Sequence, residues 1–149
     1  MRQTNTQEYA NGLAQMSNWK STVTIRPSYK LKPHTSDRLI ERISKRLRTR
    51  VFYTMEKDWN EEVYHLHLLL DKNVADKQLS QASGLNLKAI KYNEPIKSKQ
   101  AISGYIVKHL NDNHSHHNIF LQWNNLKQYQ FSSQRTIKTN FKIKLNKTD

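Results

Sequence analysis

The chain has 149 residues, with 25 Lys and Arg against 12 Asp and Glu, and a formal net charge of +13. This length predicts one compact domain, and the absence of cysteine excludes disulfides, thiolate catalysis, zinc fingers and iron–sulfur clusters. No apolar stretch approaches the roughly 20 residues of a membrane span, and the polar N-terminus lacks the apolar core of a secretory signal. We therefore expect a basic, cytoplasmic protein that binds polyanions, and nucleic acid fits best.

The charge is unevenly distributed along the chain. Residues 20–50 and residues 86–149 each carry a net charge of +8, whereas residues 51–85 carry −3. A local acidic region inside a cationic protein suits a divalent metal ion held beside a phosphate backbone. A solvated surface with uneven charge would give the same pattern.

The order of the expected elements predicts an α+β fold, ferredoxin-like, in which a central antiparallel sheet of about five strands is flanked by helices. A flexible polar arm is expected over residues 1–17, a folded domain over residues 18–126 and a basic extension, with room for one more strand at 141–145, over residues 127–149. β-branched runs, alternation and helical spacing of apolar residues define the elements. In chain order these are a strand at 19–26, a helix from Thr35 or Ser36 to Leu47, a hairpin of strands at 50–56 and 63–70, a short helix within 71–83 ended by Gly84, a strand at 85–92, a helix at 98–110 and a strand at 119–123.

The segment YHLHLLL at residues 64–70 contains a candidate metal-binding pair. Because successive side chains of a strand face opposite ways, Leu66 and Leu68 share one face while His65 and His67 share the other. Two imidazoles at that spacing can bind one metal ion. The alternative is a structural or incidental pair. His114-Ser115-His116 repeats the pattern, but in a polar stretch with no strand pattern, so no rigid platform is expected there.

Glu56 is the expected third ligand. It closes the strand at residues 50–56, and a hairpin would return it beside the His pair, on the same face as Thr54. Two imidazoles and a carboxylate leave coordination positions for water and a phosphate oxygen, and this mixed set accommodates Mg²⁺ or Mn²⁺. Glu61 and Glu62 in the turn are competing ligands, and an exposed strand-end charge is the alternative for Glu56.

Tyr105 and Lys108 lie three residues apart on an expected helix, so they share a face. A tyrosine oxygen can attack a phosphodiester and leave again in the reverse step. Lys108 can stabilise the phenolate or the developing phosphorane charge. A second Y-x-x-K, beginning at Tyr29, lies in a loop between two prolines. The alternative for Tyr105 is a partly buried aromatic residue on an amphipathic helix.

In their order and spacing these motifs resemble those of the HUH endonucleases, specifically the single-tyrosine rolling-circle replication initiators (Rep proteins) of small viruses and plasmids. The resemblance covers about residues 19–123. The family's first motif falls on the TVTI segment at residues 22–25, which lacks the usual leading Phe-Leu-Thr; its second falls on residues 65–67, and its third on residues 105–108. Glu56 matches the acid that supplies the third metal ligand in the Reps of circular single-stranded DNA viruses.

The resemblance implies metal-dependent nicking and joining of single-stranded DNA at an origin, including hairpin origins, through a 5′-phosphotyrosine intermediate on Tyr105. A free 3′-hydroxyl would serve a polymerase, and a viral or host helicase would unwind the template, because the chain contains no P-loop motif. The cytoplasm of a host cell is the expected location, and the oligomeric state stays open, with a dimer as one option. Strand parity places four further residues on the metal-binding face, where we expect them to line a DNA channel: Lys20, Thr22, Thr24 and Arg26.

Other interpretations stay open. A single-strand transposase of the HUH class has a similar length and one tyrosine, but usually carries Gln rather than Lys after it. A conjugative relaxase would use an N-terminal tyrosine such as Tyr9 together with a third strand-borne His. A ferredoxin-like RNA or single-stranded DNA-binding protein would use the same basic and aromatic residues without chemistry, and its affinity would not depend on a chelator. A zinc site is a further option, drawn from four histidines: His109, His114, His116 and His117.

Overall fold

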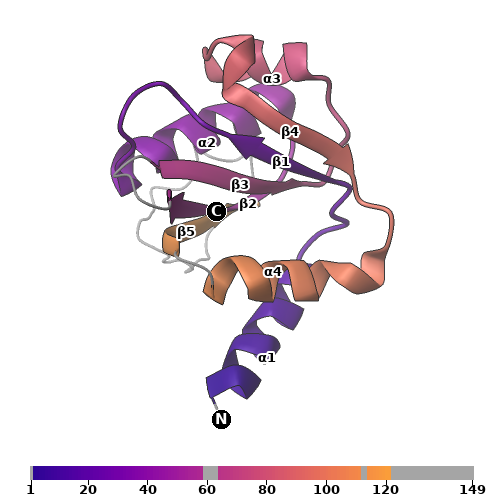
Figure 1. Cartoon of the computed structure of the whole chain (residues 1–149). Helices are drawn as coiled ribbons and strands as arrows, with labels where there is room; N and C mark the ends of the chain where they lie inside the picture. Colours follow the sequence, from indigo (N-terminus) through magenta and orange to yellow (C-terminus); the bar gives the residue numbers. More distant parts are fainter. Residues whose placement is uncertain (1, 59–63, 112–113, 122–149) are drawn as a thin grey trace, which may run out of the picture.

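The computed structural model describes residues 2–58, 64–111 and 114–121. Within these residues five strands form one antiparallel sheet in the order β4-β1-β3-β2-β5 (Figure 1). The strands are β1 (Ser21–Ile25), β2 (Val51–Lys57), β3 (Tyr64–Leu70), β4 (Ile90–Pro95) and β5 (His114–Phe120). Four α-helices accompany them in the described part of the chain: α1 (Arg2–Gln15), α2 (Pro33–Leu47), α3 (Asp76–Ser83) and α4 (Ile102–Asn111). The predicted α+β fold with a five-stranded antiparallel sheet is confirmed.

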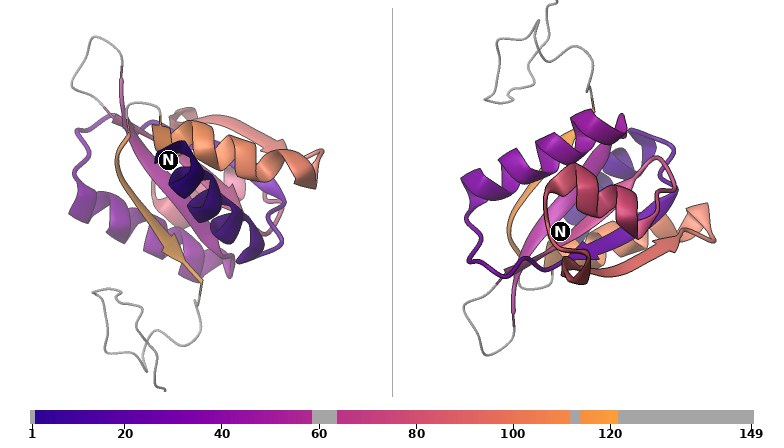
Figure 2. Two further views of the ribbon diagram at one scale, coloured as in Figure 1. Left: turned by 90° about the horizontal axis from the view of Figure 1, so that it is seen from below. Right: turned by 90° about the horizontal axis from the view of Figure 1, so that it is seen from above.

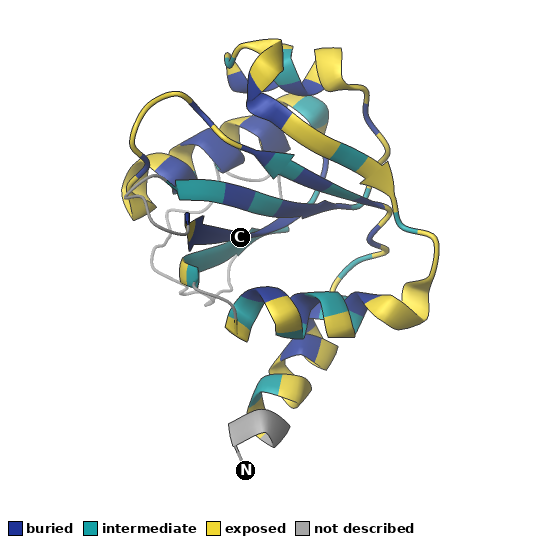
Figure 3. Ribbon diagram, in the orientation of Figure 1, coloured by how far each residue is buried: buried dark blue, intermediate teal, exposed yellow. Residues whose placement is uncertain are grey.

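The helices cover the sheet in pairs, α2 and α3 on one face and α1 and α4 on the other (Figure 2). On the first face, Leu39, Ile40 and Ile43 of α2 pack on strand residues such as Val23 and Leu68. The apolar residues whose helical spacing predicts this helix therefore form its buried face. On the second face a smaller apolar cluster joins Phe52 and Leu69 of the sheet to Ile102 and Ile106 of α4 and Leu13 of α1. Figure 3 shows the buried residues along the inner surfaces of these layers.

Residues 2–15 form helix α1, so the expected flexible arm is wrong for this part of the chain. Ala10 and Leu13 are buried against the second face, together with Trp19. The Trp19 indole Nε1 donates a hydrogen bond to the Leu13 carbonyl oxygen at 3.0 Å, which anchors the end of the helix. Because α1 contains few apolar residues, its sequence shows only a weak helical periodicity, and this weak periodicity leads to the prediction of a polar arm.

Strands β1, β2 and β3 begin within two residues of the predicted positions, whereas β4 and β5 each begin five residues away from theirs. β4 begins at Ile90 rather than at residue 85, because Leu87–Ala89 form a short 3₁₀ turn that the Asn86 side chain caps, accepting from the Lys88 backbone N–H at 2.8 Å. β5 begins at His114 rather than at residue 119. The NDNHSHHN stretch therefore does supply a strand. The predicted strand at residues 141–145 lies outside the described residues.

The early start of β5 is not predicted because the register between β5 and β2 is irregular. Glu56 pairs with His114 whereas Met55 pairs with His116, so one extra residue is accommodated at Ser115. This irregularity breaks the alternation by which strands are recognised. As a result His114 pairs with Glu56 and His117 pairs with Thr54, so both histidines lie on the same face of the sheet as these two partners.

Gly84 ends α3 as predicted, with φ of +77° in the left-handed region that favours glycine. No helix among residues 2–58, 64–111 and 114–121 is long and apolar enough to cross a membrane.

Candidate active site

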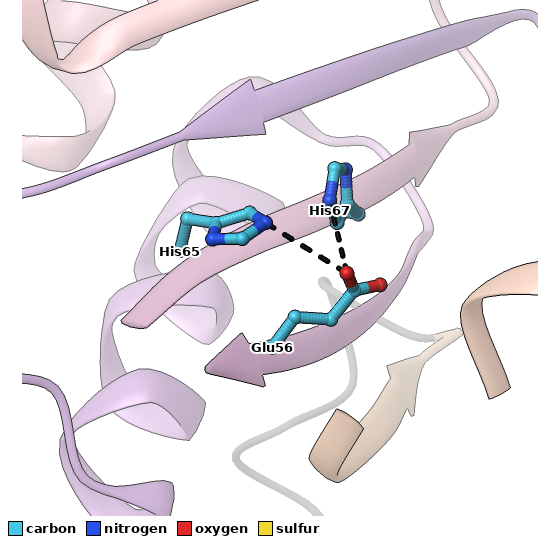
Figure 4. A group of neighbouring side chains, drawn as sticks. All are labelled: Glu56, His65 and His67. Atoms are coloured by element: carbon cyan, nitrogen blue, oxygen red, sulfur yellow. Dashed lines mark ion pairs between the residues drawn. The ribbon is translucent and has the colours of Figure 1, made fainter. Parts of the chain in front are cut away.

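Glu56, His65 and His67 converge on the second face of the sheet (Figure 4). The β2–β3 hairpin pairs Glu56 with His65 and Thr54 with His67, as the sequence predicts. The Glu56 Oε1 atom lies 3.7 Å from His65 Nε2 and 3.4 Å from His67 Nε2. One ligand atom from each residue lies within 4.8 Å of the others, so this group could hold a metal ion. Glu61 and Glu62, the competing ligands, lie outside the described residues.

The other ring nitrogen of each histidine is already engaged. His65 Nδ1 donates to Asp58 Oδ1 at 2.5 Å, and Asp58 in turn forms an ion pair with Arg26. His67 Nδ1 lies 3.1 Å from the Thr24 hydroxyl. With Nδ1 held in both rings, each Nε2 is directed at the Glu56 carboxylate. This is the arrangement that outer partners impose on metal-ligating histidines, so the donor set fits a divalent cation.

Burial and hydrogen bonding act in opposite directions on Glu56, which is 6% exposed. Burial would raise its pKa, but hydrogen bonds from His109 and His67 and the charge on these rings outweigh burial and lower the pKa below its ordinary value. Glu56 is therefore an ionised carboxylate at neutral pH, which is the form that binds a cation.

Tyr105 and Lys108 line a cavity that is also lined by His67, one member of the metal-binding group. The cavity has a volume of about 540 Å³ and lies between α4 and strands β1, β3 and β4. Its walls include Thr22 and Thr24 of β1 and His67 of β3. A cavity of this size is typical of small-molecule and cofactor sites. The structure thus brings together the three motifs that are far apart in the sequence.

Tyr105 is a weak acid in this environment. Burial raises the pKa of its phenol above the ordinary value, and the negative charge of Glu56 raises it further. The phenol is therefore neutral at neutral pH, and its activation as a nucleophile needs positive charge close to the oxygen.

The four residues expected to line a DNA channel have different surroundings. Thr22 is part of the cavity wall, and Thr24 lines it while holding His67. Lys20 is exposed immediately before β1. Arg26 is engaged by Asp58, so it supports the His65 side chain from behind rather than simply offering a free cation.

The four histidines of the alternative zinc site do not converge. His109 contacts Glu56, whereas His116 is directed at the other face of the sheet, where its Nε2 donates to Asp37 Oδ1 at 3.0 Å. His114 Nε2 and His117 Nδ1 are 3.3 Å apart. Tyr9, the tyrosine of the relaxase alternative, contacts His117 Nε2 at 3.0 Å instead of the metal-binding group.

Asp58 is not predicted from the sequence, and His109 is named there only as a ligand of the alternative zinc site, although a signal for the role of each residue is present. Asp58 follows Glu56 by two residues, the spacing that returns a side chain to the same face of an extended segment. His109 follows Tyr105 by four residues, which places both on one face of a helix. In the structure His109 Nδ1 lies 2.5 Å from Glu56 Oε2.

Searches against protein-family models, curated proteins and solved structures found no match to this chain.

Proposed function

We propose that this protein is a metal-dependent endonuclease that nicks single-stranded DNA and rejoins it through a covalent bond to Tyr105, in the manner of the HUH Rep proteins. One observation carries the proposal: the cavity that contains Tyr105 and Lys108 is also lined by His67, a member of the Glu56–His65–His67 group. Phosphodiester transfer to an enzyme requires a nucleophile, positive charge and a metal ion. Tyr105, Lys108 and the metal-binding group that includes His67 would supply these three components around one cavity.

The chemical step follows from the tyrosine. Tyr105 Oη attacks the scissile phosphorus, so that an Oη–P bond forms while the bond from phosphorus to the 3′-oxygen breaks. The phenolic proton is released to solvent, and the departing 3′-oxygen takes up a proton from solvent. The products are a 5′-phosphotyrosine and a free 3′-hydroxyl. Attack of a 3′-hydroxyl on the adduct reverses the step and joins two ends.

Glu56, His65 and His67 would hold Mg²⁺ or Mn²⁺, which supplies Lewis-acid polarisation of the phosphate when bound. Lys108 contributes positive charge to the same cavity and stabilises the phenolate or the charge that develops on phosphorus. This charge offsets burial and the negative charge of Glu56, which together raise the pKa of the Tyr105 phenol.

Single-stranded DNA is the substrate that the surroundings favour. The net charge of +13 attracts a polyanion. Tyr92 of β4 lines the cavity and is 51% exposed, so its ring is available for a base of an unpaired strand to stack on. A nick that leaves a 3′-hydroxyl would start rolling-circle replication, with a polymerase and a helicase supplied by the virus, the plasmid or the host.

The test is a denaturing gel of the full chain mixed with a pool of labelled single-stranded hairpin oligonucleotides and Mn²⁺. We expect DNA that stays attached to the protein through SDS, and its loss with EDTA or in Tyr105→Phe. Tyr29→Phe is the matched control, because Tyr29 begins the other Y-x-x-K motif in an exposed loop, and it should form the adduct normally.

Two outcomes would contradict the proposal. An adduct that persists in Tyr105→Phe would show that another residue is the nucleophile. No adduct with any oligonucleotide, together with salt-sensitive binding that EDTA leaves unchanged, would identify a nucleic-acid-binding protein without chemistry.

A further inference from the structure

We infer that His109 is a positioning residue: it fixes the Glu56 carboxylate for metal binding and links the metal site to the helix that carries Tyr105. The first part concerns metal binding alone. The second part, that this link serves the attacking tyrosine, rests on the proposed function.

His109 determines which oxygen of Glu56 is presented to a cation. The His109 side chain is buried, and its Nδ1 donates to Glu56 Oε2 at 2.5 Å. The Thr54 hydroxyl donates to the same oxygen at 3.3 Å. Two donors therefore hold Oε2, while Oε1 faces the Nε2 atoms of His65 and His67 at 3.7 and 3.4 Å. A carboxylate held in this way loses little further freedom when Oε1 binds a cation.

The ring of His109 also lies between the metal site and the tyrosine. Its centroid is 4.1 Å from that of His67 and 4.3 Å from that of Tyr105. His109 and Tyr105 are one turn apart on α4, whereas Glu56 belongs to β2. The bond between His109 and Glu56 therefore fastens α4 to the sheet at the level of the metal ligands. The place of Tyr105 relative to these ligands depends on this link.

A positioning role explains His109 better than a role as ligand. The nitrogen that faces the site is already engaged with Glu56 Oε2. Among the described residues, the group whose ligand atoms all lie within 4.8 Å of one another consists of Glu56, His65 and His67, without His109. His109 thus acts through Glu56.

The test is the affinity of the DNA-free full chain for Mn²⁺, measured by isothermal titration calorimetry, with the electron paramagnetic resonance spectrum of the bound ion as a second readout. His109→Leu removes the donor, and we expect the affinity to fall about 10–100-fold, the range typical of lost outer partners. His109→Asn offers an amide N–H close to the place of Nδ1, and we expect it to restore most of the affinity. His34→Leu, at an exposed site on α2, is the control and should bind as the wild type does.

His109→Leu with Mn²⁺ affinity within twofold of the wild type would overturn the inference. Circular dichroism in EDTA establishes that each variant folds. If His109→Leu does not fold, His109→Asn is compared with His109→Gln, whose longer side chain places the donor elsewhere. Equal affinity of these two variants would then overturn the inference, and tighter binding by His109→Asn would support it.

These experiments distinguish a failure of the proposed nickase activity from a failure of the proposed role of His109. A wild-type chain that binds Mn²⁺ more tightly than His109→Leu, yet forms no adduct with DNA, would refute the nickase and keep the role of His109 at Glu56. An adduct that forms equally well in the wild type and in His109→Leu at limiting Mn²⁺ would keep the nickase and refute the inference.

Discussion

The two faces of the sheet are built from alternate residues of the same strands, yet they have different chemistry. On β3, Leu66, Leu68 and Leu70 point to the face under α2 and α3 and are fully buried there. His65 and His67, which alternate with Leu66 and Leu68, point to the face under α1 and α4 and stay partly exposed. The period of two in one seven-residue strand thus separates the leucines of the larger core from the two histidines of the site.

The same division runs along β2, and each face has a carboxylate with different partners, the half-buried Asp37 on the first face and the buried Glu56 on the second. On the first face Asp37 of α2 accepts from the Tyr53 hydroxyl at 2.5 Å and from His116 and Asn118. These hydrogen bonds make it a structural link between α2 and the sheet. On the second face Oε1 of Glu56 is directed at two histidine Nε2 atoms. The oxygen of Asp37 accepts from three donors, and such hydrogen bonds stabilise a fold. Oε1 of Glu56 instead lies close to two imidazole nitrogens, and these three atoms together can bind a cation.

The strongest test of this division compares neighbours in the chain, His67→Ala and Leu68→Ala. His67→Ala should abolish specific Mn²⁺ binding and adduct formation while the free energy of unfolding changes little. Leu68→Ala should lower the free energy of unfolding by about 2–5 kcal/mol, because it leaves a cavity in the aliphatic core, and the folded fraction should still bind Mn²⁺. Urea unfolding and calorimetry measure both quantities. Loss of stability in His67→Ala as large as in Leu68→Ala would show that the two faces are not separate.

A smaller effect is expected from a second pair of variants, Asp58→Asn and Asp37→Asn. Each replaces a carboxylate that accepts from a histidine, at 2.5 Å for His65 and 3.0 Å for His116, but on opposite faces. Asp58→Asn should weaken Mn²⁺ binding about 10–100-fold, because His65 loses the partner that orients it. Asp37→Asn should leave Mn²⁺ binding unchanged and lower stability by about 1–3 kcal/mol. Mn²⁺ affinity that falls equally in both variants would contradict this assignment.

The sequence predicts the parts of this division that depend on local periodicity. Alternation in residues 64–70 assigns His65 and His67 to one face, and the hairpin brings Glu56 beside them. The helical spacing of Ile102 and Ile106 predicts a helix at residues 98–110, and the structure has it at Ile102–Asn111, after a 3₁₀ turn at Lys99–Ala101. What the sequence does not predict depends on contacts between distant elements. α1 is fixed by Ala10 and Leu13 against α4, β5 is hidden by an irregularity at Ser115, and the bond between His109 and Glu56 joins residues 53 positions apart.

The smallest expected effect is a pH dependence of the free energy of unfolding. It arises at His117 of β5, on the same face of the sheet as Glu56. Burial, followed by the nearby charges of His114 and His116, lowers the pKa of His117 to about 4. Tyr9 of α1 and Phe52 of β2 also face this ring. Since an unfolded chain binds the proton near pH 6.5, the unfolded state holds more protons between about pH 6.5 and 4, and stability falls as the pH drops through this window.

Partial exposure of His117 limits this loss to about 1 kcal/mol. Glu56 and Asp37 have lowered pKa values and remain ionised over most of this window, so they contribute at lower pH. His117→Gln removes the titrating ring, and its longer side chain keeps an amide oxygen close to the place of Nε2 as an acceptor for the Tyr9 hydroxyl. Its free energy of unfolding, measured with urea at pH 7 and pH 5, should therefore change less between the two pH values than that of the wild type. An unchanged difference would show that His117 is not the acid-sensitive group.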